Sequence, residues 1–256
     1  MDLNLKNKVV LVTGASRGIG KAIAVAFANE GAQLSLCGRT PGTLDQAVSE
    51  IKTLGAEVFA KPTDITNGQQ AKAFVNSTLD KFGRIDVLVN NVGGSKKTAT
   101  LELSDEEWHE LLDLNAISAA RMSQLVIPAM KKQGGGVILM ISSIFGRESG
   151  GHITYNAGKA AEISLTKSLA REFAPDNIRV LSVAPGSILF PGGGGERKQK
   201  AEPEKIAAFI KSDLPFGRFG KVEEIADVVV FLASERASWV SGTCINVDGC
   251  QSRSNI

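Results

Sequence analysis

The stretch KVVLVTGASRGIG, from Lys8 to Gly20, decides how this chain folds. Its first part, Val9 to Val12, is a run of aliphatic residues without alternation, which is typical of a strand covered on both faces in a parallel sheet. Gly14, Gly18 and Gly20 then open a pattern of apolar residues at helical spacing. Because glycine lets the backbone turn tightly, and because the free N–H groups of a helix start attract anions, the stretch predicts a phosphate-binding turn.

Strands and helices alternate along the rest of the chain. Further strands are predicted at residues 33–37, 57–61, 86–90, 137–141, 178–183 and 244–247, and helices at 43–54, 69–82, 104–132, 153–173 and 222–234. Such alternation implies right-handed crossovers between parallel strands. We therefore expect an α/β fold: a single Rossmann-type doubly wound domain over residues 1–256, with a seven-stranded, mainly parallel sheet and helices on both faces.

Composition excludes several classes of function. The 29 lysine and arginine residues against 27 aspartate and glutamate residues give a net charge of +2, too small for a broad nucleic-acid-binding surface. No apolar run approaches the roughly 20 residues of a membrane span, and the first residues, MDLNLKNK, lack the apolar core of a signal peptide. Cys37, Cys244 and Cys250 lack metal-site spacing. We expect a cytoplasmic protein with no nucleic-acid partner, membrane association, disulfide framework or metal centre.

Ligands of open parallel sheets bind beyond the carboxyl ends of the strands. The residues at these ends are Gly14, Arg39, Asp64, Asn90, Ser142, Ser143, Pro185 and Gly186. Several belong to motifs that resemble the short-chain dehydrogenase/reductase family: TGASRGIG at 13–20, NNVG at 90–93, SS at 142–143, YNAGK at 155–159 and PG at 185–186. The resemblance covers nearly the whole chain and is closest to the β-ketoacyl carrier-protein reductases and related NADP-dependent ketone reductases.

The resemblance assigns catalysis to Asn115, Ser143, Tyr155 and Lys159. Tyr155 and Lys159 are four residues apart on a predicted helix, so their side chains rise from one face. A nearby ammonium group favours the phenolate form of tyrosine, so Tyr155 is expected to act as general acid/base on a carbonyl oxygen. Ser143 would hydrogen-bond that oxygen and stabilise the charge that develops there. By resemblance Asn115, in mid-helix where asparagine is a poor helix former, holds a water that links Lys159 to a proton relay.

Two interpretations of the serine pair are open. Successive strand side chains point to opposite faces, so only one of Ser142 and Ser143 faces the site. The family's usual spacing from serine to tyrosine fits Ser142. Alignment of SIFG with the serine-x-x-glycine segment of the ketoacyl reductases instead selects Ser143, with one residue deleted afterwards, and we choose Ser143.

The cofactor is predicted to be NADPH or NADP. NAD-specific sites place an acidic residue at the end of the second strand, where this chain has Gly38 followed by Arg39. Arg17 in the glycine turn is a second cation for a 2′-phosphate. Asp64 resembles an adenine contact, although capping of the following turn is an alternative. The full predicted set is Gly14, Ser16, Arg17, Gly18, Ile19, Gly20, Arg39, Thr40, Asp64, Ile65, Asn91, Gly93, Tyr155, Lys159, Pro185, Gly186 and Ile188.

The chain departs from the family pattern in two places. Val92 replaces the usual alanine of the NNAG motif. Phe190 stands where the family often has a threonine that contacts the nicotinamide carboxamide, and phenylalanine cannot donate that hydrogen bond. Ser187, backbone groups or a shifted loop must then take over the contact.

Residues 190–216 are predicted as a substrate lid, because the segment leaves the carboxyl end of the sixth strand and contains four consecutive glycines. Its apolar patch, Ile206, Phe209 and Ile210, would cover an apolar chain. A disordered surface excursion is the alternative.

We expect an NADPH-dependent reductase of a ketone, with a β-ketoacyl thioester as first choice of substrate. In the family such substrates arrive on a carrier protein that docks on arginines. Arg171 matches one of these positions, whereas near Gln133 or Gly134 arginine is missing and only Lys131 and Lys132 lie adjacent.

Two further functions are weighed against this one. The first is a reductase or dehydrogenase of a small free ketone, alcohol or sugar. The second is a non-catalytic NADP-binding regulatory protein, which would be free to lose Tyr155 or Lys159. For either enzyme the resemblance implies a homotetramer, packed through the helices at 104–132 and 153–173 and through the last strand.

Overall fold

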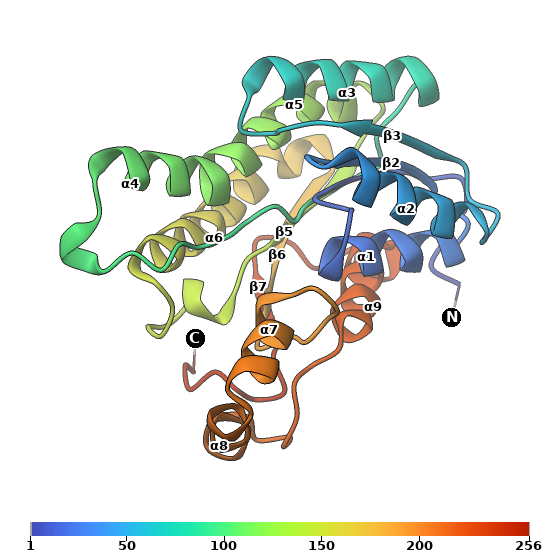
Figure 1. Ribbon diagram of the computed structural model, residues 1–256. Coiled ribbons are helices and arrows are strands. Elements are labelled where there is room, and N and C mark those ends of the chain that lie inside the picture. The colour runs from blue at the N-terminus through green and yellow to red at the C-terminus, as the bar shows by residue number, and fades with distance from the viewer. Residues whose placement is uncertain (1, 256) are drawn as a thin grey trace.

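A sheet of seven parallel strands forms the centre of the computed structural model, which describes residues 2–255 (Figure 1). The strand order is β3-β2-β1-β4-β5-β6-β7, so the chain winds outward in both directions from β1. The strands are β1 (Val9–Thr13), β2 (Gln33–Gly38), β3 (Val58–Pro62), β4 (Val87–Asn90), β5 (Gly136–Ile141), β6 (Ile178–Pro185) and β7 (Cys244–Val247). The doubly wound α/β fold predicted from the sequence is confirmed.

Helices cover both faces of the sheet. One face carries α1 (Gly18–Asn29), α2 (Pro41–Lys52) and α9 (Val222–Ala233), and the other α3 (Gly68–Phe82), α5 (Ser118–Lys132) and α6 (Ile153–Phe173). Helix α2 starts two residues before the predicted boundary because Pro41 occupies its first turn, where a missing N–H costs nothing. None of the helices in residues 2–255 is both long and apolar enough to cross a membrane.

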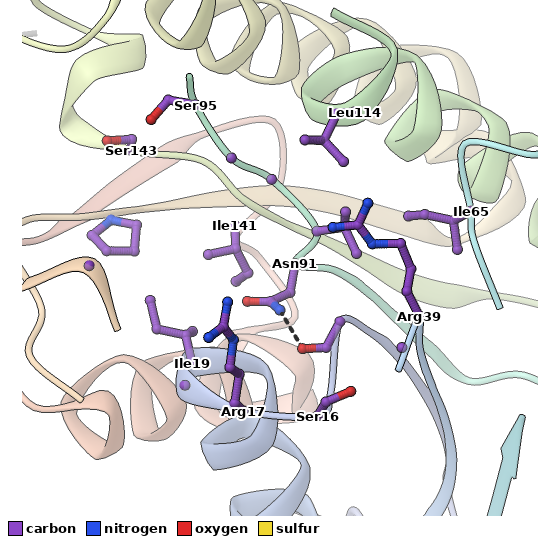
Figure 2. Close-up of a pocket in the computed structure, with 18 of the residues that line it drawn as sticks. Ser16, Arg17, Ile19, Arg39, Ile65, Asn91, Ser95, Leu114, Ile141 and Ser143 are labelled. Carbon is purple, nitrogen blue, oxygen red and sulfur yellow. Dashed lines mark hydrogen bonds between the residues drawn. The ribbon is translucent and has the colours of Figure 1, made fainter. Parts of the chain in front are cut away.

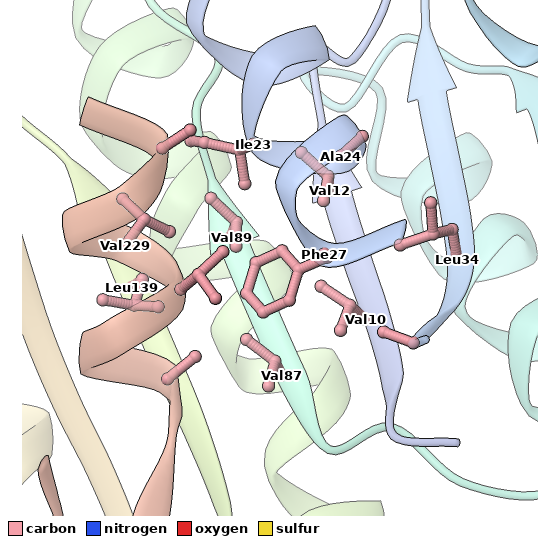
Figure 3. Close-up of a cluster of buried hydrophobic side chains, with 14 of the residues drawn as sticks. Val10, Val12, Ile23, Ala24, Phe27, Leu34, Val87, Val89, Leu139 and Val229 are labelled. Atoms are coloured by element: carbon pink, nitrogen blue, oxygen red, sulfur yellow. The ribbon is translucent and has the colours of Figure 1, made fainter. Parts of the chain in front are cut away.

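Phe27 anchors the core between α1, α9 and the sheet. Its ring is fully buried among Val10, Val87, Val89 and neighbouring aliphatic side chains (Figure 3). Burial of a side chain of this size contributes about 1.5–3 kcal/mol. This packing fixes α1, and therefore the glycine turn that precedes it, against the carboxyl ends of β1 and β4.

The helical region predicted at 104–132 is interrupted. It consists of α4 (Asp105–Leu112), a π-helical turn η2 (Asp113–Ile117) and α5. In η2 the Ser118 N–H donates to the Asp113 carbonyl five residues earlier. Asn115 is fully buried in this turn. Single π-helical turns inside α-helices are frequent at functional sites.

The predicted lid is folded rather than disordered. It contains α7 (Gly194–Ala201) and α8 (Pro203–Asp213), which extend beyond the carboxyl end of β6 (Figure 1). A parallel bridge between Ile188 and Gly220 joins the two ends of the segment. The Phe209 ring packs 6.1 Å from the Phe219 ring.

Candidate active site

A cleft of about 780 Å³ runs along the carboxyl ends of the strands. Of the predicted catalytic and cofactor residues, all line it except Gly20 and Asn115, which lie behind its wall. Ser95 and Ser143 lie at one end of the cleft, and Arg39 and Ile65 at the other (Figure 2). The structure thus brings together residues from six different strand ends, as the topology predicts.

The glycine turn forms a cradle at the start of α1. Gly14 and Gly18 have φ values of +66° and +57°, which favour glycine. A Cβ on Gly20 would overlap the Gly14 carbonyl and the Asn91 amide. The Asn91 Nδ2 donates to the Thr13 and Gly14 carbonyls, so the end of β4 holds the turn in place. The N–H groups at this helix start are therefore exposed to an anion in the cleft.

The far end of the cleft is cationic. A Cβ on Gly38 would overlap the Ser16 hydroxyl, so this hydroxyl would have to rotate to admit a side chain at the position where NAD-specific sites carry an acid. Arg39 is exposed beside it. The Arg17 guanidinium donates to the Gly192 carbonyl of the lid at 3.1 Å.

Asp64 performs the turn-capping role that the sequence left as an alternative. Its Oδ1 accepts hydrogen bonds from the Thr66 backbone N–H at 3.0 Å and hydroxyl at 2.8 Å. The residue also lines the cleft, so both interpretations from the sequence are compatible with its position.

Lys159 lies buried beneath the cleft, with 2% of its surface exposed. Its Nζ donates to the Ile141 carbonyl at 2.8 Å and lies 5.8 Å from the centre of the Tyr155 ring. A Cβ on Gly93 would lie 2.9 Å from this Nζ and 2.9 Å from the Asn115 Oδ1, so glycine is needed there. Two of the three ammonium hydrogens are donated to the Ile141 carbonyl and to the Glu162 carboxylate, and the third is left for a ligand.

The two serines after β5 make different contacts. Ser142 donates to the Lys159 carbonyl at 2.9 Å and so joins β5 to α6. The Ser143 oxygen accepts a hydrogen bond from the Phe145 N–H, which leaves its own hydrogen available at the cleft end near Ser95 (Figure 2). This division agrees with the choice of Ser143 over Ser142 as the substrate contact.

Asn115 explains the π-helical turn. Its Nδ2 donates to the carbonyls of Gly94 and Leu111, and its Oδ1 accepts from the Gly94 N–H. These bonds fix the loop after β4 against η2. Both amide hydrogens of the side chain are used by these bonds, and Oδ1 keeps one acceptor site.

Phe190 covers the glycine turn. A Cβ on Gly18 would lie 2.8 Å from the Phe190 ring, so one edge of the ring packs against that glycine. Ser187 does not line the cleft but a separate pocket. Its backbone N–H donates to the Gln251 Oε1, and its hydroxyl oxygen accepts a hydrogen bond from the Gln251 Nε2. In this conformation the Ser187 side chain therefore cannot replace the threonine contact to the nicotinamide carboxamide, and that one of the three expected substitutes is wrong.

The apolar patch of the lid also differs from the prediction. Ile206, Phe209 and Ile210 do not line the cleft, and Phe209 packs on Phe219 instead. Ser95, Leu114 and Phe190 line the cleft instead, and Ser95 lies near Ser143 (Figure 2). Charged residues with metal-site geometry are also missing: residues 2–255 contain no cluster of three His, Cys, Asp or Glu side chains that could hold a metal ion.

Known proteins share this arrangement over nearly the whole chain. Residues 14–250 match the family described as "Enoyl-(Acyl carrier protein) reductase". This chain belongs to the short-chain dehydrogenase/reductase family. A 3alpha-hydroxysteroid dehydrogenase of Mediterraneibacter gnavus is 41% identical over 254 residues, covering 97% of this chain and 98% of that protein.

Two further members of the short-chain dehydrogenase/reductase family illustrate its range of substrates. The 3-oxoacyl-[acyl-carrier-protein] reductase FabG of Thermotoga maritima is 39% identical over 248 residues, covering 96% of this chain and 98% of that protein. The structure of L-sorbose reductase from Gluconobacter frateurii, complexed with NADPH and L-sorbose, has a TM-score of 0.94 and 33% identity, covering 99% of this chain and 100% of that chain. This protein is accordingly an oxidoreductase of hydroxyl or carbonyl groups that uses a nicotinamide cofactor.

Sequence reasoning missed several residues at the site, and three of them bear on its chemistry. Ser95 and Leu114 line the cleft from a loop and from η2, whose positions depend on the π turn. Glu162 is fully buried, and its Oε2 pairs with the Lys159 Nζ at 2.8 Å. The spacing of three residues from Lys159 on one helix was a usable signal for Glu162, since such residues share a face.

Proposed function

We propose that this protein is an NADPH-dependent reductase of a ketone carbonyl. The observation that carries the proposal is the position of Lys159, buried between the Ile141 carbonyl and the Tyr155 ring at the floor of the cleft. A structural lysine would not need to be held beside the chain's single tyrosine at the wall of a ligand cleft.

The residues of the cleft suit a dinucleotide phosphate. The glycine cradle would let the backbone approach the pyrophosphate closely, because Gly14 and Gly18 adopt turn conformations that favour glycine at the start of α1. Arg39 and Arg17 would pair the 2′-phosphate, for which Arg17 must leave the Gly192 carbonyl. The third ammonium hydrogen of Lys159 would bind a ribose hydroxyl.

In the mechanism that we propose, bound NADPH supplies the hydride. Tyr155 gives its phenolic proton to the carbonyl oxygen as negative charge develops there. The Ser143 hydroxyl donates a second hydrogen bond to the same oxygen. Lys159 stabilises the phenolate that Tyr155 becomes, and Asn115 holds the loop and the π turn that surround the ammonium group.

The position of the cations expected to dock a carrier protein bears on the choice of substrate. Lys131 and Lys132 end α5 and Arg171 ends α6, just before β5 and β6 begin, so these cations lie at the amino edge of the sheet, opposite the cleft. Gln133 is bonded to the Ile85 backbone and Lys131 to Asp176. A carrier protein docked on these cations would therefore lie at the opposite edge of the sheet from this subunit's own cleft.

We therefore favour a free ketone over a carrier-bound β-ketoacyl thioester, which would require the cleft of a neighbouring subunit. Exposed Ser95 beside Ser143 adds a hydroxyl that can bind a polar substituent on such a ketone. The experiment is a screen of NADPH oxidation with hydroxysteroid ketones, ketoses, diketones and acetoacetyl thioesters on carrier protein and on a small thiol. Turnover confined to carrier-bound thioesters would overturn this preference, and no turnover of any carbonyl would overturn the reductase itself.

A further inference from the structure

Glu162 is a buried carboxylate that the mechanism above does not use. It lies one turn after Lys159 on α6 with none of its surface exposed. Its Oε2 accepts a hydrogen bond of 2.8 Å from the Lys159 ammonium. Its Oε1 is buried and has no hydrogen-bond partner among residues 2–255. A buried carboxylate with an unsatisfied oxygen is costly, which indicates a function beyond packing.

Lys159 without this partner would present a full positive charge beside the tyrosine. The ammonium group lies 5.8 Å from the centre of the Tyr155 ring, and Lys159 itself is 2% exposed. An unpaired cation at this distance favours phenolate strongly, because low-dielectric surroundings screen it little. Reduction of a carbonyl needs the opposite state, a phenol that still holds its proton.

We propose that Glu162 is a positioning residue that restrains the charge of Lys159 and so keeps Tyr155 protonated, which favours carbonyl reduction over alcohol oxidation above neutral pH. The inference rests on the proposed role of Tyr155 as the acid. With Glu162 ionised, the tyrosine faces an ion pair instead of a lone cation. The Lys159 Nζ is also held at a fixed point between Glu162 and the Ile141 carbonyl.

Other charges do not compete for this pair. Among the charged groups on elements packed against α6, Asp113 pairs with Arg121, Glu110 with Lys96 and Lys131 with Asp176, Glu107 bonds Thr98, and Arg147 and Arg179 bond backbone carbonyls, while Asp105 and Lys132 are exposed. His109 on α4 acts on Glu106. The charge that acts on Glu162 is that of Lys159, and those that act on Lys159 are Glu162 and Tyr155.

Protonation of Glu162 sets the pH range of the effect. Burial raises the pKa of the Glu162 carboxyl to about 7, against the lowering influence of Lys159. A raised pKa means that the carboxyl is neutral below that pH and charged above it. Tyrosine titrates in the alkaline range, where Glu162 carries its full charge. A variant without the charge will therefore differ from the parent most clearly above neutrality.

The test is an alkaline titration of tyrosinate absorbance in the cofactor-free protein. Tyr155 is the only tyrosine of the chain, so this signal reports one residue. Glu162→Gln keeps the volume and a hydrogen-bond acceptor but removes the charge. The carboxylate lies about 10 Å along the helix from Tyr155, so we expect the titration midpoint to fall by about one pH unit.

Three variants complete the design. Glu162→Met removes the charge without a polar group and should give the same downward shift, which keeps the test usable if the glutamine variant is unstable. Glu162→Asp keeps the charge and should titrate close to the parent. Glu172→Gln is the matched control, because it removes an exposed carboxylate from the end of the same helix.

The alkaline limb of the pH profile for carbonyl reduction should move with the titration, to lower pH in Glu162→Gln. Coincident tyrosinate midpoints in the parent and both neutral variants would overturn the inference, as would an equal shift in Glu162→Asp. Because the titration needs neither substrate nor cofactor, it judges this inference separately from the proposed ketone reduction.

Discussion

The Ser142 hydroxyl donates a hydrogen bond of 2.9 Å to the backbone carbonyl of Lys159. This contact joins the end of β5 to the helix that carries Tyr155, whereas Ser143 turns its hydroxyl to the cleft. We therefore propose that the two adjacent serines separate a structural task from a chemical one.

Substitution of each serine should separate these tasks experimentally. Ser143→Ala should lower kcat by about 10²–10³-fold, because one donor to the developing oxyanion is lost. Ser142→Ala should lower the free energy of unfolding by about 1 kcal/mol, with a much smaller loss of kcat. Steady-state kinetics and urea unfolding measure both effects. A larger kcat loss in Ser142→Ala than in Ser143→Ala would reverse the assignment.

Arg39 should decide the choice of cofactor. Arg39→Asp removes a cation and adds repulsion toward a 2′-phosphate, so kcat/KM with NADPH should fall about ten-fold or more while kcat/KM with NADH changes little. The control is Lys72→Asp, an equal charge change on an exposed residue of α3. Equal efficiency of the unmodified protein with both cofactors would contradict the NADP assignment.

Much of the fold was predictable because β1, β4 and β5 are mainly apolar runs, each with a polar residue at or just after its end. The run of four aliphatic residues from Val9 and the glycines after it are a local signal of this kind. The predicted strand at 57–61 is displaced by one residue from β3, since strand ends depend on pairing with β2 rather than on composition.

The π turn, the lid packing and the Lys159 partner could not be predicted in the same way. The π turn depends on bonds from Asn115 to Gly94, 21 residues away in the sequence. The aromatic residue of the lid patch packs on Phe219 because the Ile188–Gly220 bridge brings the ends of the segment together. The role of Glu162 becomes visible only once α6 is known to bury that face.

Cys37 should be chemically inert in the folded protein. Burial raises the pKa of its thiol to about 12, so the reactive thiolate is scarce at any pH below that value. The exposed Cys250 should react first with a thiol reagent at pH 8, followed by the partly exposed Cys244. Mass spectrometry should find Cys37 modified only after unfolding. Labelling of Cys37 in the native protein at a rate close to that of Cys250 would show that the second strand is accessible.

A homotetramer is expected in solution. Trp239 beside β7 is 99% exposed and Ile117 in η2 is 51% exposed, which leaves apolar surface on both regions that the resemblance assigns to subunit contacts. Light scattering at micromolar concentration should give four times the chain mass, and Trp239→Glu should give half of that. A monomer mass for the unmodified protein would refute the assembly.

The most direct test of the central claim is the kinetics of Tyr155→Phe with a ketone identified in the screen. The variant keeps the ring beside Lys159 and loses only the hydroxyl, so NADPH affinity, measured by fluorescence titration, should stay close to that of the parent. Turnover should nearly vanish, because no group is left to give the proton. Loss of the general acid should lower kcat by more than roughly ten-fold. A variant that binds NADPH normally and keeps more than roughly a tenth of the parent kcat would therefore show that Tyr155 is not the acid.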